Sequence, residues 1–322
     1  MSFTIAVTGA AGRLGQVLVP LIEKKYKTRL LVRNKEDLLR GRGRSQFVEI
    51  NLEKASVEDM RRAIKGVNCI VHLAGLVDLR AKREKLFAVN YSITEKLLMA
   101  AMAERVKFFI HTSSISVYAD SDKLISENSA KKPVTVYGES KLAAERAVTS
   151  SHLDWVVLRP GLIYGPHFKE GFIQLIEQMK NKRAAIIGTG DNNVPLVFEG
   201  DVAKAFVKSI DLLKTGNKRI LRQAFNVVGE PVTQREAFTI LSKVFVLPMP
   251  VKRVSINFAK TVASLYSFVS KLTGKQSAFP PEYVELLARN RVYDVRKAKK
   301  FFGFVASTPL RKGMQAIRKE WA

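Results

Sequence analysis

The pair Tyr137 and Lys141 carries a phenol and an amine four residues apart in the chain. On a helix this spacing places both side chains on one face. A free tyrosine has a pKa of about 10, so its phenol needs help to exchange protons near neutral pH. A neighbouring ammonium group gives that help because it stabilises the phenolate. The pair therefore suits general acid/base catalysis.

A run of hydroxyl side chains stands upstream of this pair, in the sequence His-Thr-Ser-Ser-Ile-Ser-Val-Tyr of residues 111–118. It follows an apolar segment that predicts a buried strand. Hydroxyls at the carboxyl end of such a strand lie next to the ligand crevice of an α/β sheet, where they can hydrogen-bond a substrate carbonyl or alcohol. Taken alone, Thr112, Ser114 and Ser116 would be interpreted more simply as turn-forming residues.

A glycine-rich loop follows the first predicted strand, with the spacing G-x-x-G-x-x-G. The first glycine permits a sharp turn, the second lets a pyrophosphate approach the backbone, and the third allows a helix to pack closely on the strand. Free N–H groups and the positive end of the helix dipole then favour phosphate. A tight turn without a ligand is the alternative, but the position after a first strand favours a dinucleotide site. Its residues are Gly9, Ala11, Gly12, Arg13, Leu14 and Gly15.

The end of the second predicted strand bears on the choice of dinucleotide. An acidic residue there would bind the ribose 2′-hydroxyl of NAD, whereas this chain has Arg33 in the sequence Leu-Val-Arg-Asn-Lys. Arg33, together with Arg13, could hold the 2′-phosphate of NADP by charge-assisted hydrogen bonds. An Arg33 side chain that simply lies in solvent is the alternative. The sequence favours NADP over NAD.

Short apolar runs alternate with helical patterns along the first half of the chain. Most runs are continuously apolar, as expected for parallel strands covered on both faces. The repetition predicts right-handed βαβ units, a Rossmann-type doubly wound parallel α/β sheet, and a nucleotide site at the carboxyl ends of its strands. Pro20 predicts a kink or an irregular turn in the first helix, and Ser56 with Asp59 predicts a cap on the second. The predicted strands are 4–8, 29–32, 47–50, 68–74, 108–113, 155–159 and 225–228, and the predicted helices are 12–24, 57–64, 83–103, 136–149, 171–181 and one from residue 201.

The alternation breaks after Pro166, and beyond Thr233 the pattern is mostly helical. No clean linker and no internal repeat divide the chain. We expect residues 1–166 to form a dinucleotide-binding domain to which part of 188–230 returns. Residues 167–187 and 231–322 would then form a smaller, mostly helical lobe, interleaved with the first, that binds substrate.

Composition limits the other function classes. The single cysteine, Cys69, excludes an internal disulfide and an all-cysteine metal site. The four histidines have no metal-ligand spacing, so we expect no metal, and we expect His72 and His111 to be satisfied core groups. Neither a signal-peptide pattern nor an uncharged apolar run of about 18 residues occurs. We expect a cytoplasmic protein that at most rests on a membrane surface.

Charge is the unusual feature, with 54 Lys and Arg against 29 Asp and Glu and a net charge of +25. Such a charge attracts anions, including nucleotide phosphates, anionic lipid and nucleic acid, and a solvated basic surface is the plain alternative. Nucleic acid is disfavoured, because no basic motif interleaved with aromatic residues occurs. A stripe of apolar residues at helical spacing favours a buried helix, with a roof over a lipid-sized pocket or a contact with anionic membrane as alternatives. The stripe is Phe258, Val262, Leu265, Val269 and Leu272.

Together these motifs resemble the extended short-chain dehydrogenase/reductase superfamily, which contains the NAD-dependent epimerase/dehydratase families. The resemblance covers nearly the whole chain and implies an NAD(P)-dependent enzyme with a small-molecule substrate. Homodimers are common in this superfamily, so a homodimer is a further expectation. Besides the glycine loop and residues 112–118 and 137–141, it includes His-Leu-Ala-Gly at 72–75, Val-Asn at 89–90, Leu-Arg-Pro-Gly-Leu-Ile-Tyr-Gly-Pro at 158–166, Gly-Asp-Val-Ala at 200–203, Phe-Asn-Val-Val-Gly at 225–229 and Tyr-Asp at 293–294.

The resemblance also implies roles for individual residues. Tyr137 would be the general acid/base, Lys141 would lower its pKa and bind the nicotinamide ribose, and Ser114 would orient the reacting oxygen. Members usually carry Asp before Leu after the third strand to hold the adenine amine, and the carbonyl of Asn51 can accept the same bond. The other expected contacts are Arg33, Leu52, Leu73, Ala74, Gly75, Asn90, Thr112, Pro160, Gly161, Leu162 and Ile163 for the cofactor, and Ser114, Ser116 and Tyr164 for the substrate.

Substrate class divides the members that the chain resembles. Sugar-nucleotide epimerases and dehydratases often carry an arginine before the strand that leads into Gly-Asp-Val-Ala, but residues 193–198 contain no base, although Arg289 or Arg291 could contribute. The C-terminal part is more similar to 3β-hydroxysteroid and sterol dehydrogenases, and dihydroflavonol-reductase-like enzymes share the basic residue after the second strand. We therefore expect interconversion of a secondary alcohol and a ketone on an apolar substrate that is sterol-like, lipid-like or polyketide/flavonoid-like. The second hypothesis is a sugar-nucleotide epimerase/dehydratase with tightly bound NAD, and the third is a non-enzymatic cofactor-sensing or nucleic-acid-binding Rossmann protein.

Overall fold

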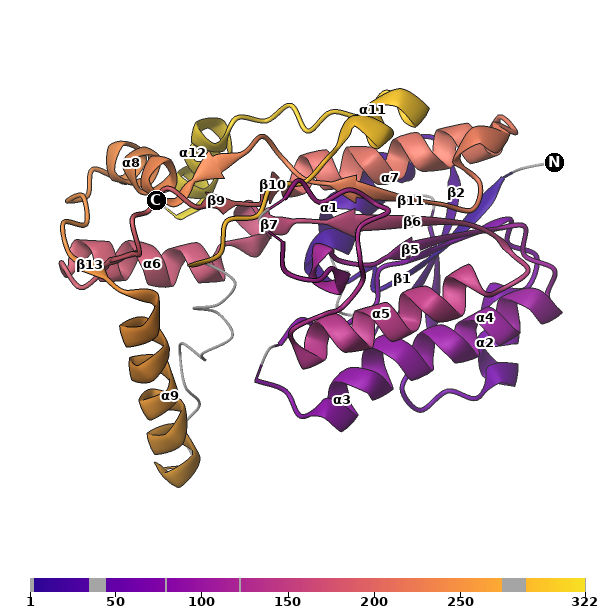
Figure 1. The fold of residues 1–322 in the computed structure, drawn as a ribbon. Coiled ribbons are helices and arrows are strands. Elements are labelled where there is room, and N and C mark those ends of the chain that lie inside the picture. Colours follow the sequence, from indigo (N-terminus) through magenta and orange to yellow (C-terminus); the bar gives the residue numbers. More distant parts are fainter. Residues whose placement is uncertain (1–2, 35–44, 79, 122, 274–287, 322) are drawn as a thin grey trace.

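A seven-stranded parallel sheet forms the centre of the computed structural model, which describes residues 3–34, 45–78, 80–121, 123–273 and 288–321, with 266–273 described by backbone alone. The strand order is β11-β6-β5-β4-β1-β2-β3 (Figure 1). Each predicted strand is present and belongs to this sheet, which confirms the Rossmann-type fold. Its strands are β1 (Thr4–Thr8), β2 (Lys27–Val32), β3 (Gln46–Glu49), β4 (Cys69–His72), β5 (Phe108–Thr112), β6 (Asp154–Pro160) and β11 (Gln223–Val227).

Helices cover both faces of the sheet (Figure 1). On one face α1 (Arg13–Ile22) packs against α7 (Glu199–Lys214), and on the other α2 (Val57–Ile64), α4 (Ile93–Ala103) and α5 (Val136–Thr149) lie side by side. One apolar core fills each interface. The strand order reverses between β1 and β4, so the carboxyl ends of these two strands border the crevice where α/β sheets bind ligands.

Local sequence signals explain several element boundaries. The predicted cap of α2 is confirmed, because Ser56 and Asp59 form a reciprocal capping box. Helix α1 runs through Pro20 and ends two residues later, at Ile22. The single helix predicted for 83–103 is wrong: α3 (Arg83–Phe87) and α4 are joined by a π-helical turn, η2 (Ala88–Ser92). Such turns are frequent at functional sites. Strand β4 is shorter than predicted: Leu73 N still bonds the backbone carbonyl of Thr8, but Ala74 N bonds the Thr8 hydroxyl instead of a backbone carbonyl.

A smaller lobe packs around a third apolar core. It is built from short two-stranded ladders and from helices on either side of the stretch that returns to the main sheet as α7 and β11. The 3₁₀ helices η3 (Ile115–Val117), η4 (Pro166–Phe168) and η5 (Lys218–Ile220) complete the connections. The lobe's pairs are β7 (Leu162–Tyr164) with β10 (Leu196–Phe198), β9 (Asn193–Val194) with β12 (Val232–Thr233), and β8 (Ile186–Ile187) with β13 (Arg253–Val254), and its helices are α6 (Glu170–Lys180), α8 (Gln234–Phe245) and α12 (Leu310–Trp321). Helix α11 (Arg296–Phe302) instead packs on β11 and α7, in the core of the main sheet.

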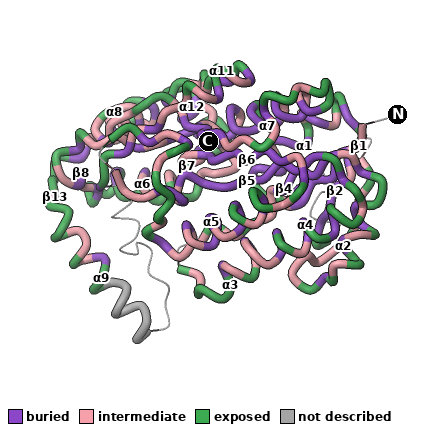
Figure 2. Tube along the Cα trace, turned by 45° about the vertical axis from the view of Figure 1, so that its right-hand side comes forward, coloured by how far each residue is buried: buried purple, intermediate pink, exposed green. Residues whose placement is uncertain are grey.

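Helix α9 (Ile256–Thr273) stands away from both lobes (Figures 1 and 2). The prediction of a buried helix is wrong here, because Phe258 is 60% exposed and Leu265 62% exposed. Val262, between them, is partly buried, so of the three described side chains of this stripe two face solvent. The side chains of Val269 and Leu272 lie outside the described residues. Within the described ranges, no helix is long and apolar enough to span a bilayer.

Candidate active site

The glycine loop at the carboxyl end of β1 has room for backbone only. Gly9 has φ +68°, and a Cβ there would lie 2.7 Å from Ala74 N. A Cβ on Gly15 would lie 2.2 Å from Ala10 O, so α1 can approach the strand this closely only without a side chain. Gly12 caps α1, and none of the described side chains caps that end. The first N–H groups of α1 are thus left for an anion.

The phenol of Tyr137 is fixed by the start of α5. Thr135 caps this helix by accepting a hydrogen bond from Gly138 N at 3.0 Å. A Cβ on Gly138 would lie 2.4 Å from Ser116 O, so the glycine lets α5 press against the turn that follows β5. The Ser114 hydroxyl at that turn hydrogen-bonds Tyr137. Two residues far apart in the chain therefore meet where the sequence predicts a reaction site.

Burial controls the acidity of the phenol. It raises the pKa of Tyr137 to about 12, and the hydrogen bond from Ser114 acts in the opposite direction. At neutral pH the phenol therefore carries its proton and is set to donate it. The predicted lowering of the Tyr137 pKa by Lys141 stays a prediction, since the Lys141 ammonium hydrogen-bonds the backbone carbonyl of Thr112 in this structure.

The amine of Lys141 lies under the same turn. Its Nζ donates a hydrogen bond to Thr112 O at 2.5 Å, and the side chain is buried. Burial lowers the pKa of Lys141 to about 8, while the nearby Glu145 carboxylate acts to raise it. A Cβ on Gly75 would lie 3.8 Å from this Nζ, so the amine and the His-Leu-Ala-Gly segment border the same space. An ammonium has three donors, so Lys141 can bind a hydroxyl besides Thr112.

A buried ion pair between Arg159 and Glu145, which was not predicted from the sequence, holds together the segments that carry the reaction site. Arg159 on β6 donates to both carboxylate oxygens of Glu145, at 2.5 and 3.0 Å. The same carboxylate accepts a hydrogen bond from Ser113 Oγ at 2.6 Å, and Arg159 Nη1 donates to the Tyr118 phenol at 2.5 Å. The network thereby ties β6 and α5 to the turn that carries Ser114. An arginine inside the apolar run 155–160 was the available signal.

Asn90 lies buried in the π-helical turn η2, and contacts within the chain occupy its side chain. Its Oδ1 accepts from Leu76 N at 2.7 Å, and its Nδ2 donates to Leu76 O at 3.1 Å and to Ser140 Oγ at 2.9 Å. Ser140 Oγ in turn donates to Tyr137 O at 2.7 Å. Asn90 thus joins the loop after β4 to the helix of the phenol, and its predicted contact with the cofactor stays a prediction.

Two buried histidines lie behind this loop. His72 bonds Thr8 Oγ1 at 2.7 Å and Thr94 Oγ1 at 2.9 Å, and burial lowers its pKa to about 3, so it is a neutral, satisfied core group as expected. His111 stacks on His72 with ring centroids 5.6 Å apart. For His111 the expectation is wrong, because neither ring nitrogen has a hydrogen-bond partner among the described residues. Its neighbour His72 already uses both nitrogens on threonines.

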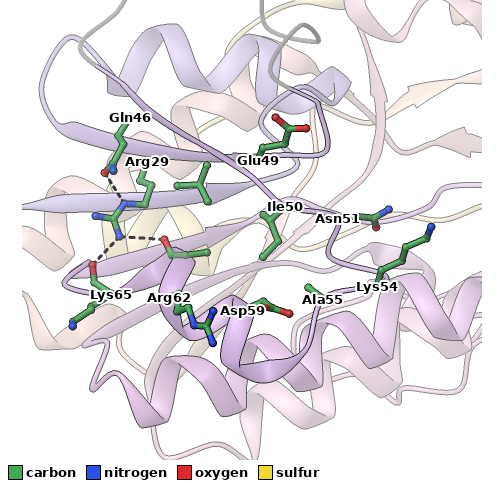
Figure 3. Close-up of a pocket in the computed structure, with 12 residues that line it drawn as sticks. Arg29, Gln46, Glu49, Ile50, Asn51, Lys54, Ala55, Asp59, Arg62 and Lys65 are labelled. Atoms are coloured by element: carbon green, nitrogen blue, oxygen red, sulfur yellow. Dashed lines mark hydrogen bonds between the residues drawn. The ribbon is translucent and has the colours of Figure 1, made fainter.

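The adenosine end of the expected cofactor site is open. Arg33 pairs with Glu53 at 3.1 Å, with its side chain 69% exposed. Arg13, the other residue expected to hold a 2′-phosphate, contacts different segments: it pairs with Glu170 of α6 at 3.0 Å and lies over the Phe168 ring, with its side chain 50% exposed. Asn51 lines an open groove of about 710 Å³ between β3 and α2, and Figure 3 shows Arg29 at the far end, bonded to Gln46 and to two backbone carbonyls.

The strand β7 brings the remaining predicted residues to the boundary between the lobes. A Cβ on Gly161 would lie 2.4 Å from Pro195 O, which fixes the Pro160–Ile163 stretch against β10. Leu162 is 46% exposed, whereas Tyr164 is buried in the core of the second lobe, where its ring packs on Phe172 and Phe198. Burial raises the pKa of Tyr164 well above its ordinary value. The structure brings Ser114, Tyr137, Lys141 and Thr112 together and leaves Tyr164 apart from them.

These residues fit a dinucleotide. The glycine loop leaves backbone N–H groups for its phosphates, and Lys141 has donors for its ribose. Thr112 Oγ1 is buried without a hydrogen-bond partner in the described part of the chain, beside the Lys141 amine, so it too can bind a polar group. Within the same part, no three His, Cys, Asp or Glu side chains come together as a metal site requires.

Comparison with known proteins now decides the family. The model of the NAD dependent epimerase/dehydratase family matches residues 5–227. The chain belongs to this family. It is therefore an enzyme of the extended short-chain dehydrogenase/reductase type, and the third hypothesis, a non-enzymatic module, is set aside.

The relatives differ in substrate. A 4-hydroxy-2-methyl-3-oxo-4-farnesyl-3,4-dihydroquinoline-1-oxide ketoreductase of Stigmatella aurantiaca is 25% identical over 97% of this chain and 95% of its own length. A decarboxylating sterol-4-alpha-carboxylate 3-dehydrogenase of Mus musculus is 28% identical over 92% of this chain and 85% of its own. Among solved structures, UDP-glucuronic acid 4-epimerase from Bacillus cereus in complex with NAD has a TM-score of 0.76 at 20% identity, covering 99% of this chain and all of that one, and shows the fold alone.

Proposed function

We propose that this enzyme interconverts a secondary alcohol and a ketone on an apolar substrate, with a nicotinamide dinucleotide as hydride carrier. The observation that carries the proposal is the contact of Ser114 with Tyr137 at the crevice edge of the sheet, beside the buried Lys141. A phenol that carries its proton, next to a hydroxyl that can hold the same oxygen, is the equipment for protonating a carbonyl.

The residues divide the work as follows. A bound nicotinamide would supply the hydride for reduction of the carbonyl carbon or accept it in oxidation of the alcohol. In reduction the Tyr137 phenol gives its proton to the carbonyl oxygen and becomes a phenolate, and in oxidation the Tyr137 phenolate accepts the proton of the alcohol. Ser114 Oγ holds the oxygen, while Thr112 O keeps Lys141 in place for the ribose. Asn90 and the Arg159–Glu145 pair fix the two segments that carry these groups.

Several contacts support an apolar substrate. Two exposed apolar side chains lie close in sequence to expected cofactor contacts: Leu162, two residues after Pro160, is 46% exposed, and Val77, two residues after Gly75, is 65% exposed. Asn193, in the stretch that often carries arginine in sugar-nucleotide enzymes, bonds Asn290 Oδ1 through both its backbone N and its Nδ2, each at 2.9 Å. Arg289 and Arg291 both pair with the Asp120 carboxylate, which offsets their charge toward a substrate phosphate. The ketoreductase and sterol dehydrogenase relatives also support this class.

We further propose that NADP is preferred over NAD. Arg33 is held by Glu53 only through an exposed ion pair, a kind of contact that contributes little and is readily exchanged. A 2′-phosphate offers Arg33 a stronger, charge-assisted partner than a 2′-hydroxyl does. The family's name and the solved complexes with NAD make NAD the comparison that any test must include.

Oxidation of NADPH or NADH by the purified chain tests the proposal, with a steroid ketone and UDP-glucose as parallel substrates. We expect turnover of the ketone with added cofactor and a loss of about 10²-fold or more in kcat for Tyr137→Phe. Cofactor affinity, read by NADPH fluorescence, should stay nearly unchanged in this variant. Tyr91→Phe is the matched control, because among the described residues the Tyr91 phenol donates its hydrogen bond to Glu95, an exposed residue at the start of α4.

One result would overturn the proposal in favour of the sugar-nucleotide hypothesis. Protein that carries NAD through purification and epimerises UDP-glucose without added cofactor is an epimerase. If Tyr137→Phe then lost that epimerase activity, the role of Tyr137 as acid/base would be supported, and the proposed substrate class would be wrong.

A further inference from the structure

Helix α9 carries exposed apolar side chains that no other described part of the chain covers. The helix begins after Ser255, whose Oγ accepts from Phe258 N at 3.2 Å, and its base is held by β13, which pairs with β8. Figures 1 and 2 show it projecting from the second lobe as a single rod. Its packed side reaches as far as the buried Ala263, while most of the other side chains described from Ile256 to Leu265 are exposed or partly exposed.

Two neighbouring sectors of α9 are apolar. One sector, Ala259 and Ala263, packs on Ile187 and Ala288 in a small core cluster. The other holds Phe258 and Leu265, seven residues apart and therefore on one line of the helix, with 60% and 62% of their surfaces exposed. A helix that only closed a core would end its apolar sector at the packed face. This one extends it into solvent.

The sequence of this segment carries charge of one sign. Residues 251–273 contain four cations and no Asp or Glu. Lys252 and Arg253 lie exposed at the base of the helix, beside Val251, which is 88% exposed. An apolar line next to a cluster of cations matches a lipid surface, which presents negatively charged headgroups in front of its hydrocarbon. The four cations are Lys252, Arg253, Lys260 and Lys271.

We propose that α9 docks this enzyme on an anionic lipid surface, with Phe258 and Leu265 entering the interface and the basic residues at its base contacting lipid headgroups. No described helix spans the bilayer, so the contact is peripheral. Charge complementarity favours an anionic lipid surface, because such a surface offers both negative headgroups and hydrocarbon wherever the helix meets it. A protein partner would need an acidic groove with an apolar floor along the same line. The docking is independent of the proposed substrate class.

Co-sedimentation of the full chain with vesicles tests the proposal. We expect binding to phosphatidylcholine vesicles that contain phosphatidylglycerol, weak binding to phosphatidylcholine alone, and a decrease as salt is added. Phe258→Asp and Leu265→Asp should each lower partitioning about tenfold or more, the loss expected when a large apolar side chain no longer leaves water. Lys252→Glu combined with Arg253→Glu should remove the preference for the anionic lipid.

Met99→Asp is the matched control, because Met99 is 51% exposed on α4, a helix far from α9 in Figures 1 and 2. It should bind vesicles as the unmodified chain does, and circular dichroism should show all variants folded. Equal binding by Leu265→Asp, or equal binding of the unmodified chain to neutral and anionic vesicles, overturns the proposal. So does a dimer that Leu265→Asp converts to monomer without any vesicle binding, since a second copy would then cover the sector.

Discussion

The two ends of the cofactor crevice are built in opposite ways. At the reaction end, the polar groups are buried and bonded to one another: Lys141 to Thr112 O, and Glu145 to Arg159 and Ser113. Elsewhere the cations stand largely in water: Arg33, at the expected adenosine end, pairs with the partly exposed Glu53, and Arg13, at the start of α1, pairs with the exposed Glu170 of α6.

The contrast assigns a different physical task to each end. Buried polar groups hold one geometry, because leaving any of them unpaired is costly. Burying the Lys141 ammonium itself costs free energy, since the charged group loses its water. Exposed ion pairs cost and contribute little, so they can exchange partners when a ligand arrives. We therefore expect substitutions at the reaction end to change the free energy of unfolding, and those at the adenosine end to change ligand choice.

Arg159→Met should have the largest effect on stability. It leaves the Glu145 carboxylate buried with Ser113 as its remaining partner, and removes the donor to Tyr118. We expect the free energy of unfolding to fall by about 3–5 kcal/mol, measured by denaturant titration. Adding Glu145→Leu should recover part of the loss, since no charge is then left unpaired. A single variant as stable as the unmodified chain would show that the buried pair does not hold this end together.

Lys141→Met should stabilise the fold while it lowers activity. Burial lowers the pKa of Lys141 from its ordinary 10.5 to about 8, so between these values the unfolded chain binds a proton that the folded chain has released. The stability of the unmodified enzyme contributed by this group therefore rises with pH from about 8 to 10.5. Below pH 8 the variant should be more stable by about 1–3 kcal/mol, and this advantage should vanish above pH 10.5. A constant advantage across that range would contradict the burial of a charged amine.

The reaction end was in large part predictable from sequence. Tyr137 and Lys141 share a helix face whatever surrounds them, and the strand that leads to Ser114 is an uninterrupted apolar run, so local rules locate both segments. Parallel strands place their carboxyl ends at one edge, which brings the segments together. The Arg159–Glu145 pair was not predictable in the same way, because it depends on the relative position of β6 and α5 along their axes, which local sequence patterns do not specify.

Other misses have a similar origin. The helical pattern of 83–103 contains no glycine or proline that would mark the π-helical turn at Asn90; that turn depends on Leu76 and Ser140, from separate segments. Likewise, the spacing of apolar residues predicts an apolar sector on α9, but it does not predict whether another element or solvent covers that sector. At the adenosine end, Arg33 was predicted as a ligand group, while its partner Glu53 follows a separate strand.

Arg33→Ala should change cofactor preference rather than folding. The variant loses the cation proposed to bind the 2′-phosphate, so KM for NADPH should rise about tenfold while KM for NADH stays nearly constant. Glu53→Gln is the opposite change, because it removes the carboxylate that competes for Arg33. It should lower KM for NADPH. Equal changes for both cofactors in Arg33→Ala would show that this end does not read the 2′ position.

Arg13→Ala should have the smallest effect on stability. It therefore gives the lower limit in the comparison of exposed with buried ion pairs. Its pair with Glu170 is exposed on both sides, and its guanidinium also lies 5.3 Å from the centre of the Phe168 ring. We expect the free energy of unfolding to change by less than about 0.5–1 kcal/mol, and added salt to shrink even that difference. Denaturant titrations at low and high salt measure it. A loss as large as that of Arg159→Met would mean that water-exposed and buried pairs support this fold equally, against the dielectric argument that separates them.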